Sequence, residues 1–551
     1  MSALVTSRQA LRAVFANPAL RNLELAWLGS SSGHFAYAVA LSVYAYRHGG
    51  ASAVGVVWLL RTLPAAAVAP FTAVLSDRYR RERVMLIGNL VRAAAAGATA
   101  AAVVWGAPTE LVYALSILVA MVGTSFWPAQ TAILPTLSRT PAELTGANTV
   151  STTLDNVGTF LGPALCGLLL VLTSIEAAFL ATGAAFVVSA LLLTRVHTER
   201  ALGYDGGEAA GAVVAQLLGG FRAVLRNRDI ALLTGVHSAW AIAEGALSVL
   251  LVVAAIDLLD LGEGGVGLLN AAIGVGGVAG AVIALGLAGR SRLARFLALA
   301  LACWGLPLAI VGLSPTLVVA VLVLGVVGVA RIVTEVVGVT LLQRVVRDEL
   351  RSRVFGVLEA LWVAGIGLGA IAAPALIAVA GEDEAFIAFG LAPLGLMLVV
   401  WPWLRTVDAA TTPPPRELEL VRGVPFLALL PAPAVEQLAR KLVPMRAAAG
   451  ETVIREGERG DRFYIIGDGR AEVTVQGERV ATRGPGDFFG EIALLRRTPR
   501  TATVTARTDL ELFALEQAEF LAAVTGHTRS AAEADRVASA RLAATALPRV
   551  P

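Results

Sequence analysis

The sequence predicts an all-α membrane domain of twelve helices, followed by a small β-roll with flanking helices. Three observations predict this fold. The chain of 551 residues is 56% hydrophobic and only 15% charged, whereas ordinary soluble proteins contain about 25% charged residues. Long apolar segments follow one another as far as Arg405. Beyond the proline run at 411–415, short strand-like segments with glycine turns replace them.

Twelve apolar segments precede Arg405, each near or above the roughly 20 residues with which a helix crosses a bilayer. They lie at 22–46, 52–76, 84–106, 109–136, 143–172, 175–195, 229–257, 263–288, 293–313, 315–344, 352–380 and 384–404. Their continuous Ala, Leu and Val content differs from the alternation of a membrane β-barrel. The sequence therefore predicts a membrane domain over 1–410 with two six-helix halves, about 1–196 and 229–405.

The charge of the loops predicts the orientation. Arginines concentrate in the loops after the second, eighth and tenth segments, whereas the loops after the seventh and eleventh are acidic. Because loops rich in Arg and Lys stay in the cytoplasm, we expect both termini and the long loop at 196–228 to be cytoplasmic. The protein is then an integral protein of the cell membrane with the lipid bilayer as its first partner. Its net charge of +3 gives no reason to expect nucleic-acid binding.

The loop between the second and third segments reads AVLSDRYRRER at 73–83. With six plus six helices around it, this loop resembles the signature of the major facilitator superfamily, which Asp77, Arg78 and Arg81 match. Ala73 and Arg80 stand where that family has glycines. The resemblance implies a secondary transporter for a small molecule, in which Asp77 helps to latch the two halves together. The alternative is a basic loop that only sets the topology.

The fifth segment contains NVGTFLGPALCG at 156–167. Gly158, Gly162, Pro163 and Gly167 make it similar to the antiporter motif of proton-coupled exporters. Small residues allow helix backbones to approach closely, and the proline bends the helix. Ordinary helix packing needs the same residues and is the alternative. The stretches at 126–137 and 342–356 also resemble the exporter branch of the superfamily.

Ionisable side chains inside the membrane are costly, so each is a functional candidate. They are His34, Arg61, Arg92, Asp155, His237, Glu244, Arg331, Glu335 and Glu359. Arg331 and Glu335 are four residues apart, and we expect them to form a structural ion pair.

A carboxylate in a cavity of low polarity can carry a proton near neutral pH. The candidate proton carriers are, in order, Glu244, Asp155 and Glu359, and His237 shares a helix face with Glu244. Snorkelling at helix ends and local pairing are the structural alternatives.

The last part of the chain, 416–551, follows a linker at 411–415 that we expect to be a stiff extended spacer. A helix is expected at 433–442, and two strand-like runs occupy 463–480. Further strands are expected at 501–506 and 510–515, and helices at 516–524 and 530–546. This order indicates a small β-roll with a helical tail.

The stretch FFGEIALLRRTPRTATV at 488–504, with GERGDRFYIIGDGRAEV at 457–473, resembles the phosphate-binding cassette of cyclic nucleotide-binding domains. Gly490 has no side chain, so a ligand can approach the backbone. One helical turn follows, whose free N–H groups at Ile492 and Ala493 can face a phosphate. Arg500 offers two parallel donors to that phosphate.

The resemblance implies a regulatory cyclic nucleotide. Glu491 is expected to accept a hydrogen bond from the ribose 2′-hydroxyl, while the Thr501 hydroxyl and the Ala502 amide add donors. Phe489, Ile492 and Leu494 are expected to pack inward. Cyclic AMP is favoured over cyclic GMP, although Thr501 resembles domains in which a hydroxyl meets the guanine amino group. A roll that has lost its ligand is the alternative.

Together these patterns predict a proton-coupled exporter of small amphipathic molecules, regulated by cyclic nucleotide in its cytoplasmic domain. The sequence contains no Gly-x-x-x-x-Gly-Lys-Ser/Thr loop for ATP, so an ion gradient is the expected energy source. We expect no enzymatic activity and no metal site, and the sequence indicates no particular oligomeric state. The alternatives are a membrane receptor that does not transport, or a regulated importer of a metabolite.

Overall fold

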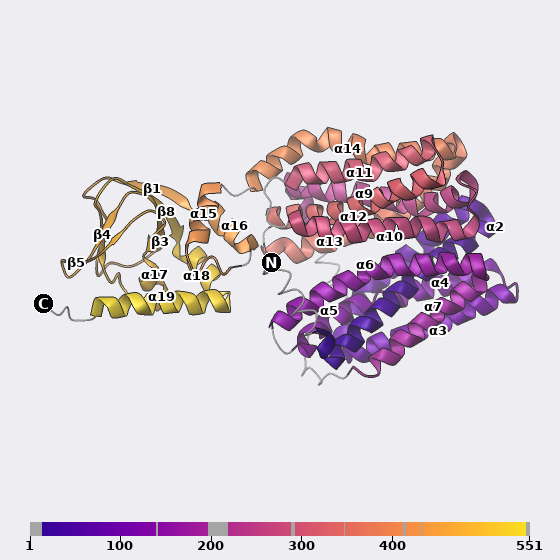
Figure 1. The fold of residues 1–551 in the computed structure, drawn as a ribbon, viewed down its shortest axis with the longest axis horizontal. Helices are drawn as coiled ribbons and strands as arrows, with labels where there is room; N and C mark the ends of the chain where they lie inside the picture. The colour runs from indigo at the N-terminus through magenta and orange to yellow at the C-terminus, as the bar shows by residue number, and fades with distance from the viewer. Residues whose placement is uncertain are drawn as a thin grey trace. The chain divides into compact units, whose positions relative to one another are not determined.

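The computed structural model describes residues 14–138, 141–196, 219–287, 293–346, 348–411, 415–430 and 432–546. These residues form two compact units, of which the first ends at Asp408 and the second begins at Ala409. Figure 1 shows long helices in the first unit, and strands with shorter helices in the second.

The first unit is a bundle of long helices. Its elements are α2 (Pro18–Arg78), α3 (Arg81–Val104), α4 (Thr109–Gly123), α5 (Phe126–Leu137), α6 (Pro141–Leu172), α7 (Ile175–Leu193), α9 (Arg228–Val253), the π-helix η1 (Ala254–Leu258), α10 (Gly262–Leu287), α11 (Leu293–Leu313), α12 (Leu317–Val345), α13 (Asp348–Ala380) and α14 (Glu382–Thr411). A short helix also covers 219–226. Within the described residues, eleven helical stretches are long and apolar enough to cross a membrane.

The first of these stretches contains two of the segments expected from the sequence. The backbone of α2 leaves the helical region at Gly49 and Gly50. Gly50 has a φ of 60°, in the left-handed region that glycine adopts without the penalty of a side chain. This bend separates the expected segments at 22–46 and 52–76, so the twelve-helix fold class is confirmed.

Two helices differ from the expected segments in their bounds. The segment expected at 109–136 is divided into α4 and α5 at Thr124 and Ser125, whose hydroxyls donate to the carbonyls of Met121 and Val122 at 2.7 and 2.8 Å. Such local bonds compete with helix continuation. The helix α14 continues to Thr411, beyond the apolar part, because hydropathy marks the lipid-crossing stretch and not the helix end.

The two halves of the bundle meet through several helix pairs. The long helix α6 of the first half packs against α10 of the second, and α2 of the first half packs against α13 and α9 of the second. Figure 1 shows α6 and α10 as neighbours between the two sets of helices. Large side chains such as Tyr37, Phe179 and Trp304 are fully buried in the main core.

The second unit contains two four-stranded antiparallel sheets and short helices. The strands are β1 (Val443–Ala447), β2 (Thr452–Ile454), β3 (Arg462–Asp468), β4 (Ala471–Val475), β5 (Glu478–Arg483), β6 (Phe488–Phe489), β7 (Thr503–Ala506) and β8 (Leu510–Glu516). The helices are α15 (Pro415–Gly423), α16 (Ala432–Lys441), α17 (Glu491–Arg496), α18 (Gln517–Thr525) and α19 (Thr528–Ala546). The strand orders are β1-β8-β3-β6 and β2-β7-β4-β5, so the expected β-roll with flanking helices is confirmed.

The hairpin between β4 and β5 shows how local sequence sets this roll. Val475 pairs with Glu478, which leaves Gln476 and Gly477 as a two-residue turn. Their φ angles are 49° and 86°, and a type I′ turn needs a positive φ at both central positions. The expected run at 463–480 therefore contains β3, β4 and the start of β5, one strand more than expected.

Some elements were not expected from the sequence. Strands β1, β2 and β6 have two to five residues, and pairing with β8, β7 and β3 defines them. The linker expected at 411–415 begins and ends in helices, since α14 ends at Thr411 and α15 begins at Pro415. Proline is favourable at the first helical position, where its missing N–H is not needed. Residues 412–414 lie outside the described residues.

Candidate functional site

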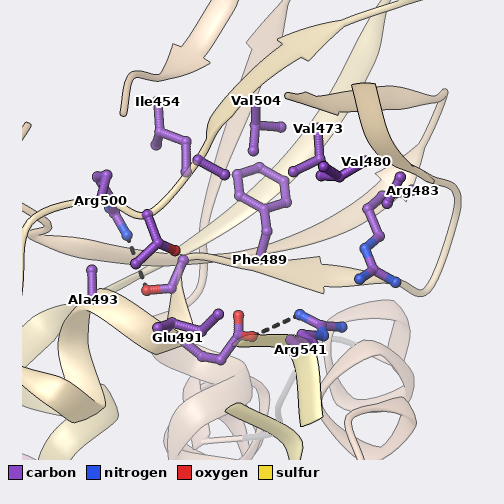
Figure 2. A pocket seen from close by; sticks show the side chains of 15 residues that line it. Ile454, Val473, Val480, Arg483, Phe489, Glu491, Ala493, Arg500, Val504 and Arg541 are labelled. Atoms are coloured by element: carbon purple, nitrogen blue, oxygen red, sulfur yellow. Dashed lines mark hydrogen bonds and ion pairs between the residues drawn. The ribbon is translucent and has the colours of Figure 1, made fainter. Parts of the chain in front are cut away.

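A pocket in the second unit opens beside β6, α17 and the start of β7. Its volume is about 150 Å³. All eight residues expected to bind nucleotide line it: Phe489, Gly490, Glu491, Ile492, Ala493, Arg500, Thr501 and Ala502. Figure 2 shows Arg500 on one side of this pocket and Arg483 on the other, with Phe489 between them.

Gly490 lets the chain turn sharply from β6 into α17. Its φ is 91°, so a side chain here would be strained. A β-carbon would also meet Arg500 Nη1 at 2.7 Å and the Arg462 carbonyl oxygen at 2.9 Å. Gly490 was expected to let a ligand approach the backbone, which stays a prediction; in the structure the Arg500 guanidinium is the group that comes close to it.

Arg500 is held in place by backbone oxygens. Its side chain is 4% exposed, and its Nη1 and Nη2 donate to the carbonyls of Gly490 and Arg462 at 3.0 and 2.8 Å. Asp461 lies 3.7 Å from Nη2. Burial lowers the pKa of the guanidinium, and Tyr464 and Asp461 oppose that shift. A guanidinium has five N–H donors, of which the two backbone bonds use two, and Arg500 also lines the pocket.

Glu491 lies at the first position of α17 and is 1% exposed. Arg541 of α19 reaches it, since Nη1 donates to Glu491 Oε1 at 2.7 Å and to the Phe488 carbonyl at 2.9 Å. The Arg541 guanidinium also lies 4.2 Å from the centre of the Phe488 ring. Figure 2 shows this ion pair at the edge of the pocket. The Glu491 carboxylate, which was expected to accept a hydrogen bond from a ribose hydroxyl, is thus already paired with Arg541.

The far side of the pocket is apolar with one basic residue. Val473 and Val480 face it from β4 and β5, and Arg483 stands at the end of β5. Burial and the nearby charge of Arg541 both lower the pKa of Arg483. The pocket therefore extends from Arg500 past these valines to Arg483.

The sequence interpretation missed Arg483 and Arg541 as pocket residues. Arg541 comes from α19, the helix that the sequence predicted at 530–546. Arg496 of α17 also contacts α19, since its Nη2 lies 2.8 Å from both Asp535 and Ser539. The only indication of Arg541 in the sequence was that it is a basic side chain on a polar helix.

Inward packing of the cassette holds for two of three residues. Phe489 stacks on Tyr464 with ring centres 5.1 Å apart, and Leu494 is fully buried in the core. Ile492 is partly exposed and lines the pocket, so it does not pack inward with the other two. Its position on the first turn of α17 directs it to the ligand side.

In the membrane unit the candidate proton carriers come together from both halves. The charges of Arg331, Glu244, Asp155 and Glu359 all act on Glu335. These residues lie on α6, α9, α12 and α13. Glu335 and Glu359 are exposed although each lies well inside its helix. Arg331 therefore lies among the charges of Glu244, Glu335 and Asp155, and this cluster contains residues of both halves.

Within this cluster, Arg331 pairs with Glu244. The partner expected from the sequence was Glu335. Arg331 Nε lies 3.6 Å from Glu244 Oε1, and Trp304 Nε1 donates to the same oxygen at 2.9 Å. The i,i+4 spacing of Arg331 and Glu335 permits a pair on one helix, but the tertiary contact with α9 prevails. In addition, Ser31 donates to Asp155 at 2.8 Å.

His237 does not contact Glu244 in the described structure. Its ring packs against Trp240 and Trp362, at centroid distances of 5.4 and 4.9 Å. The two indoles also contact each other at 4.8 Å. The shared helix face expected for His237 and Glu244 therefore carries an aromatic cluster at one end and an ion pair at the other.

The glycines of the antiporter-like motif lie where α6 meets other helices. A β-carbon on Gly158 would meet Ser31 Oγ of α2 at 2.6 Å, and one on Gly162 would meet the Ser32 carbonyl. On the other side, a β-carbon on Gly167 would meet Gly267 Cα of α10 at 2.7 Å. Pro163 lies inside the same helix. The motif thus allows α6 to approach a helix from each half.

The loop expected to carry the superfamily signature is described in part. Arg81 begins α3, and its Nη1 donates to the carbonyl of Ala132 in α5 at 3.0 Å. The side chains of Asp77 and Arg78 lie outside the described residues.

The sequence interpretation missed Glu24 of α2 as an ionisable residue inside the membrane. Glu24 is fully buried and accepts a hydrogen bond from Ser151 at 2.6 Å.

Comparison with known families matches both units. Residues 25–346, more than half of the chain, match the Major Facilitator Superfamily. Residues 444–527 match the cyclic nucleotide-binding domain. The chain is also 46% identical over 97 residues to a cAMP-dependent protein kinase regulatory subunit of Yarrowia lipolytica. That alignment covers 17% of this chain and 26% of the regulatory subunit, so the chain spans about a quarter of that relative's length.

Solved structures similar to the chain are also regulatory domains. One is the regulatory domain of Toxoplasma gondii PKA with cAMP, at 26% identity and a TM-score of 0.22, covering 24% of this chain and 56% of that one. Another is the regulatory subunit of a cAMP-independent protein kinase A from Trypanosoma cruzi bound to guanosine, at 29% identity and a TM-score of 0.21, covering 22% and 46%. From the family matches and the helical bundle, this chain belongs to the Major Facilitator Superfamily and carries a C-terminal cyclic nucleotide-binding domain.

Proposed function

We propose that the second unit binds a cyclic nucleotide and that this ligand regulates transport of a small molecule by the membrane unit. The observation that carries the proposal is one pocket lined by both Arg500 and Glu491. Arg500 supplies donors for a singly charged phosphate, and Glu491 supplies an acceptor for a sugar hydroxyl. A β-roll without a ligand has no need of a buried charge on each side of a pocket.

Cyclic AMP is the nucleotide that we favour. The support is the identity of 46% to a regulatory subunit described as cAMP-dependent. Two side chains favour cyclic GMP instead, because the Thr501 hydroxyl and the Arg483 guanidinium both line the pocket. Arginine donors match the paired acceptors on the guanine edge, whereas adenine presents an acceptor and a donor. The binding experiment therefore compares both nucleotides.

For the membrane unit we propose proton-coupled export of small amphipathic molecules. The support is the cluster of Asp155, Glu244 and Glu359, together with the close contact of α6 and α10 at the antiporter-like motif. The arginine-rich loops support a cytoplasmic position for both termini and for the nucleotide-binding domain. We place the membrane domain at 1–410, the linker at 411–415 and the nucleotide-binding domain at 416–551. An importer or a receptor without transport remains the competing class.

Calorimetry on the purified full-length protein tests the nucleotide site. We expect saturable binding of cyclic AMP, and weaker binding of cyclic GMP. Arg500→Ala should weaken binding by about 2–4 kcal/mol, since it removes the charge that meets the phosphate. Arg422→Ala, an exposed arginine on α15 outside the pocket, is the matched control and should bind as the unmutated protein does.

The results of these experiments decide between cyclic AMP and cyclic GMP, and between a transporter and a receptor. No binding of either nucleotide by the unmutated protein would sink the proposed regulatory ligand. Tighter binding of cyclic GMP, with a selective loss in Arg483→Ala, would replace cyclic AMP by cyclic GMP. Substrate-dependent proton movement in proteoliposomes separates a transporter from a receptor, and its direction separates an exporter from an importer.

A further inference from the structure

Two arginines lie deep in the first half of the membrane unit. Arg61 belongs to the second segment of α2, and Arg92 lies near the middle of α3. Their exposed fractions are 4% and 3%. A positive charge at this depth is costly unless an opposite charge or a full set of hydrogen bonds compensates it.

Neither guanidinium contacts a carboxylate of the described residues. Arg92 Nη1 donates to the uncharged Ser30 and Asn89 at 2.9 and 3.3 Å, and the guanidinium lies 4.0 Å from the centre of the Phe186 ring. Nε of Arg92 is buried without a hydrogen-bond partner. Its contacts therefore orient the side chain but leave its charge uncompensated.

Arg61 packs against two aromatic rings. Its guanidinium lies 5.8 Å from the ring of Tyr37 and 5.4 Å from that of Trp58. Both Nε and Nη1 are buried without a hydrogen-bond partner. A ring face attracts a cation by about 0.5–2 kcal/mol, which is small compared with the cost of burying a charged guanidinium.

Both arginines contact the first segment of α2. Arg92 donates to Ser30, and the Arg61 guanidinium lies over the ring of Tyr37. Ser30, His34 and Tyr37 are spaced as i, i+4 and i+7, so they share one face of the first segment of α2. The second half differs, because Arg331 there has Glu244 as its partner.

We propose that Arg61 and Arg92 bind the anionic group of the transported molecule, a carboxylate, sulfonate or phosphate joined to an apolar body. The guanidinium donors match such a group, and the rings of Tyr37, Trp58 and Phe186 match the apolar body. Headgroups of the surrounding lipid lie at the helix ends, whereas both arginines lie near mid-helix. The inference rests on the proposal that the membrane unit transports a small molecule.

Thermal unfolding of the full-length protein in lipid nanodiscs tests this assignment. The probes are 2-naphthoate and its neutral analogue 2-naphthamide, titrated in gluconate buffer. We expect 2-naphthoate to stabilise the membrane unit with at least about tenfold tighter apparent binding than the amide, because only the carboxylate pairs with a guanidinium. Chloride is titrated in the same way, as a simple anion without an apolar body.

Four variants make the result specific. Arg61→Gln and Arg92→Gln should each remove the preference for the carboxylate, while Arg61→Lys should keep part of it because the charge remains. Arg47→Gln removes an arginine of the same half that pairs with Glu263, and it should keep the full preference. Should one of the two glutamine variants fail to fold, the other still decides the question.

Three results would overturn the assignment. The first two are equal stabilisation by 2-naphthoate and 2-naphthamide, and a preference that survives in the folded glutamine variants. Stabilisation by chloride equal to that by 2-naphthoate would also overturn it, since a simple anion would then fill the site. Cyclic nucleotide added to the same samples reports on the second unit separately. A protein that responds to nucleotide and transports, but shows no carboxylate preference, leaves the proposed function standing.

Discussion

Glu491 is the buried acidic residue of the nucleotide pocket, and its partner comes from another element. Arg541 lies 50 residues further along the chain and reaches Glu491 from α19. A carboxylate that is 1% exposed needs such a partner, since an uncompensated buried charge is strongly destabilising. The same pair lies at the edge of the pocket, so a ligand that contacts Glu491 must act on Arg541.

A double-mutant cycle measures this pair. Arg541→Ala should destabilise the nucleotide-binding domain, because Glu491 would keep its charge without its partner. The loss should be smaller in the Glu491→Gln background, which gives a coupling of about 1–3 kcal/mol. Urea unfolding of residues 415–551, which contain two hydrophobic clusters of their own, provides the measurement. Additive effects of the two mutations would show that the pair contributes nothing.

Glu244 is the candidate proton carrier whose surroundings are best defined. It accepts a bond from Trp304 and faces Arg331, and its side chain is 10% exposed. Glu244→Gln keeps the size of the side chain and the bond to the indole, but removes the charge. We therefore expect this variant to bind substrate and to lose transport driven by a pH gradient.

Proteoliposome transport of a compound found by thermal-shift screening checks this expectation. Glu110→Gln, at an exposed carboxylate in the first turn of α4, is the control and should transport normally. Normal pH-driven transport by Glu244→Gln would remove Glu244 from the proton path. Asp155 and Glu359 would then be the next residues to substitute.

At the scale of elements, helix α6 is the connection between the halves. It contacts α2 through Gly158 and Gly162, and α10 through Gly167. Backbones this close leave no room for even a methyl group, and the contact depends on packing because lipid removes the hydrophobic drive between helices. A helix packed tightly against both halves is placed to transmit a change in their relative position.

Substituting Gly267 of α10 tests this contact. A β-carbon there would meet backbone atoms of α6, with the Pro163 carbonyl oxygen at 2.6 Å, and backbone cannot rotate away. Gly267→Ala should cost about 1–3 kcal/mol, as overpacking does, and lower the temperature at which purified protein stays monodisperse. Gly235→Ala in α9, where nothing lies within 4 Å, is the control and should be neutral or stabilising. An unchanged melting temperature for Gly267→Ala would contradict the close contact.

At the scale of the whole molecule, the question is whether nucleotide binding changes the membrane unit. The residues between α14 and α15 are few, since one helix ends at Thr411 and the next begins at Pro415. A ligand shifts a conformational equilibrium only by its different affinity for the two states. Couplings between such sites are typically about 1–3 kcal/mol, or roughly 5- to 150-fold in an equilibrium.

The chain contains a natural reporter for this coupling. Cys166 of α6 is 1% exposed beside the contact with α10, whereas Cys303 of α11 is partly exposed. If the halves change their relative position, the labelling rate of Cys166 by a membrane-permeant maleimide should change. We expect saturating cyclic nucleotide to change it by at least about fivefold, with Cys303 as the internal reference.

Arg500→Ala is the control for that labelling experiment. This variant should show the rate of the protein without nucleotide, because the ligand no longer binds at the concentrations used. Equal labelling of Cys166 with and without nucleotide, in protein shown by calorimetry to bind it, would argue that the domain does not gate the membrane unit. The domain would then serve stability or localisation.

The sequence by itself determined the features that depend on neighbouring residues. Twelve segments could be identified because crossing a bilayer requires a continuous apolar stretch, whatever packs around it. The cassette from Phe489 to Ala502 could be identified because a tight turn, a short helix and an arginine at fixed spacing form one local structure. The hairpin turn at Gln476 and Gly477 was not predicted, although both residues adopt the positive φ that such a turn requires locally.

Only the tertiary structure decided which distant residues meet. Arg331 has Glu335 as its neighbour along the helix but Glu244 as its partner, and Glu491 pairs with Arg541 of a helix in which the sequence showed no ligand contact. Short strands such as β6 exist only through their partners. The physical reason is that burial sets the cost of a charge, and burial depends on the packing of helices that are far apart in the chain. For the same reason the sequence could identify Arg61 as costly, but only the packing shows that its guanidinium contacts no carboxylate of the described residues.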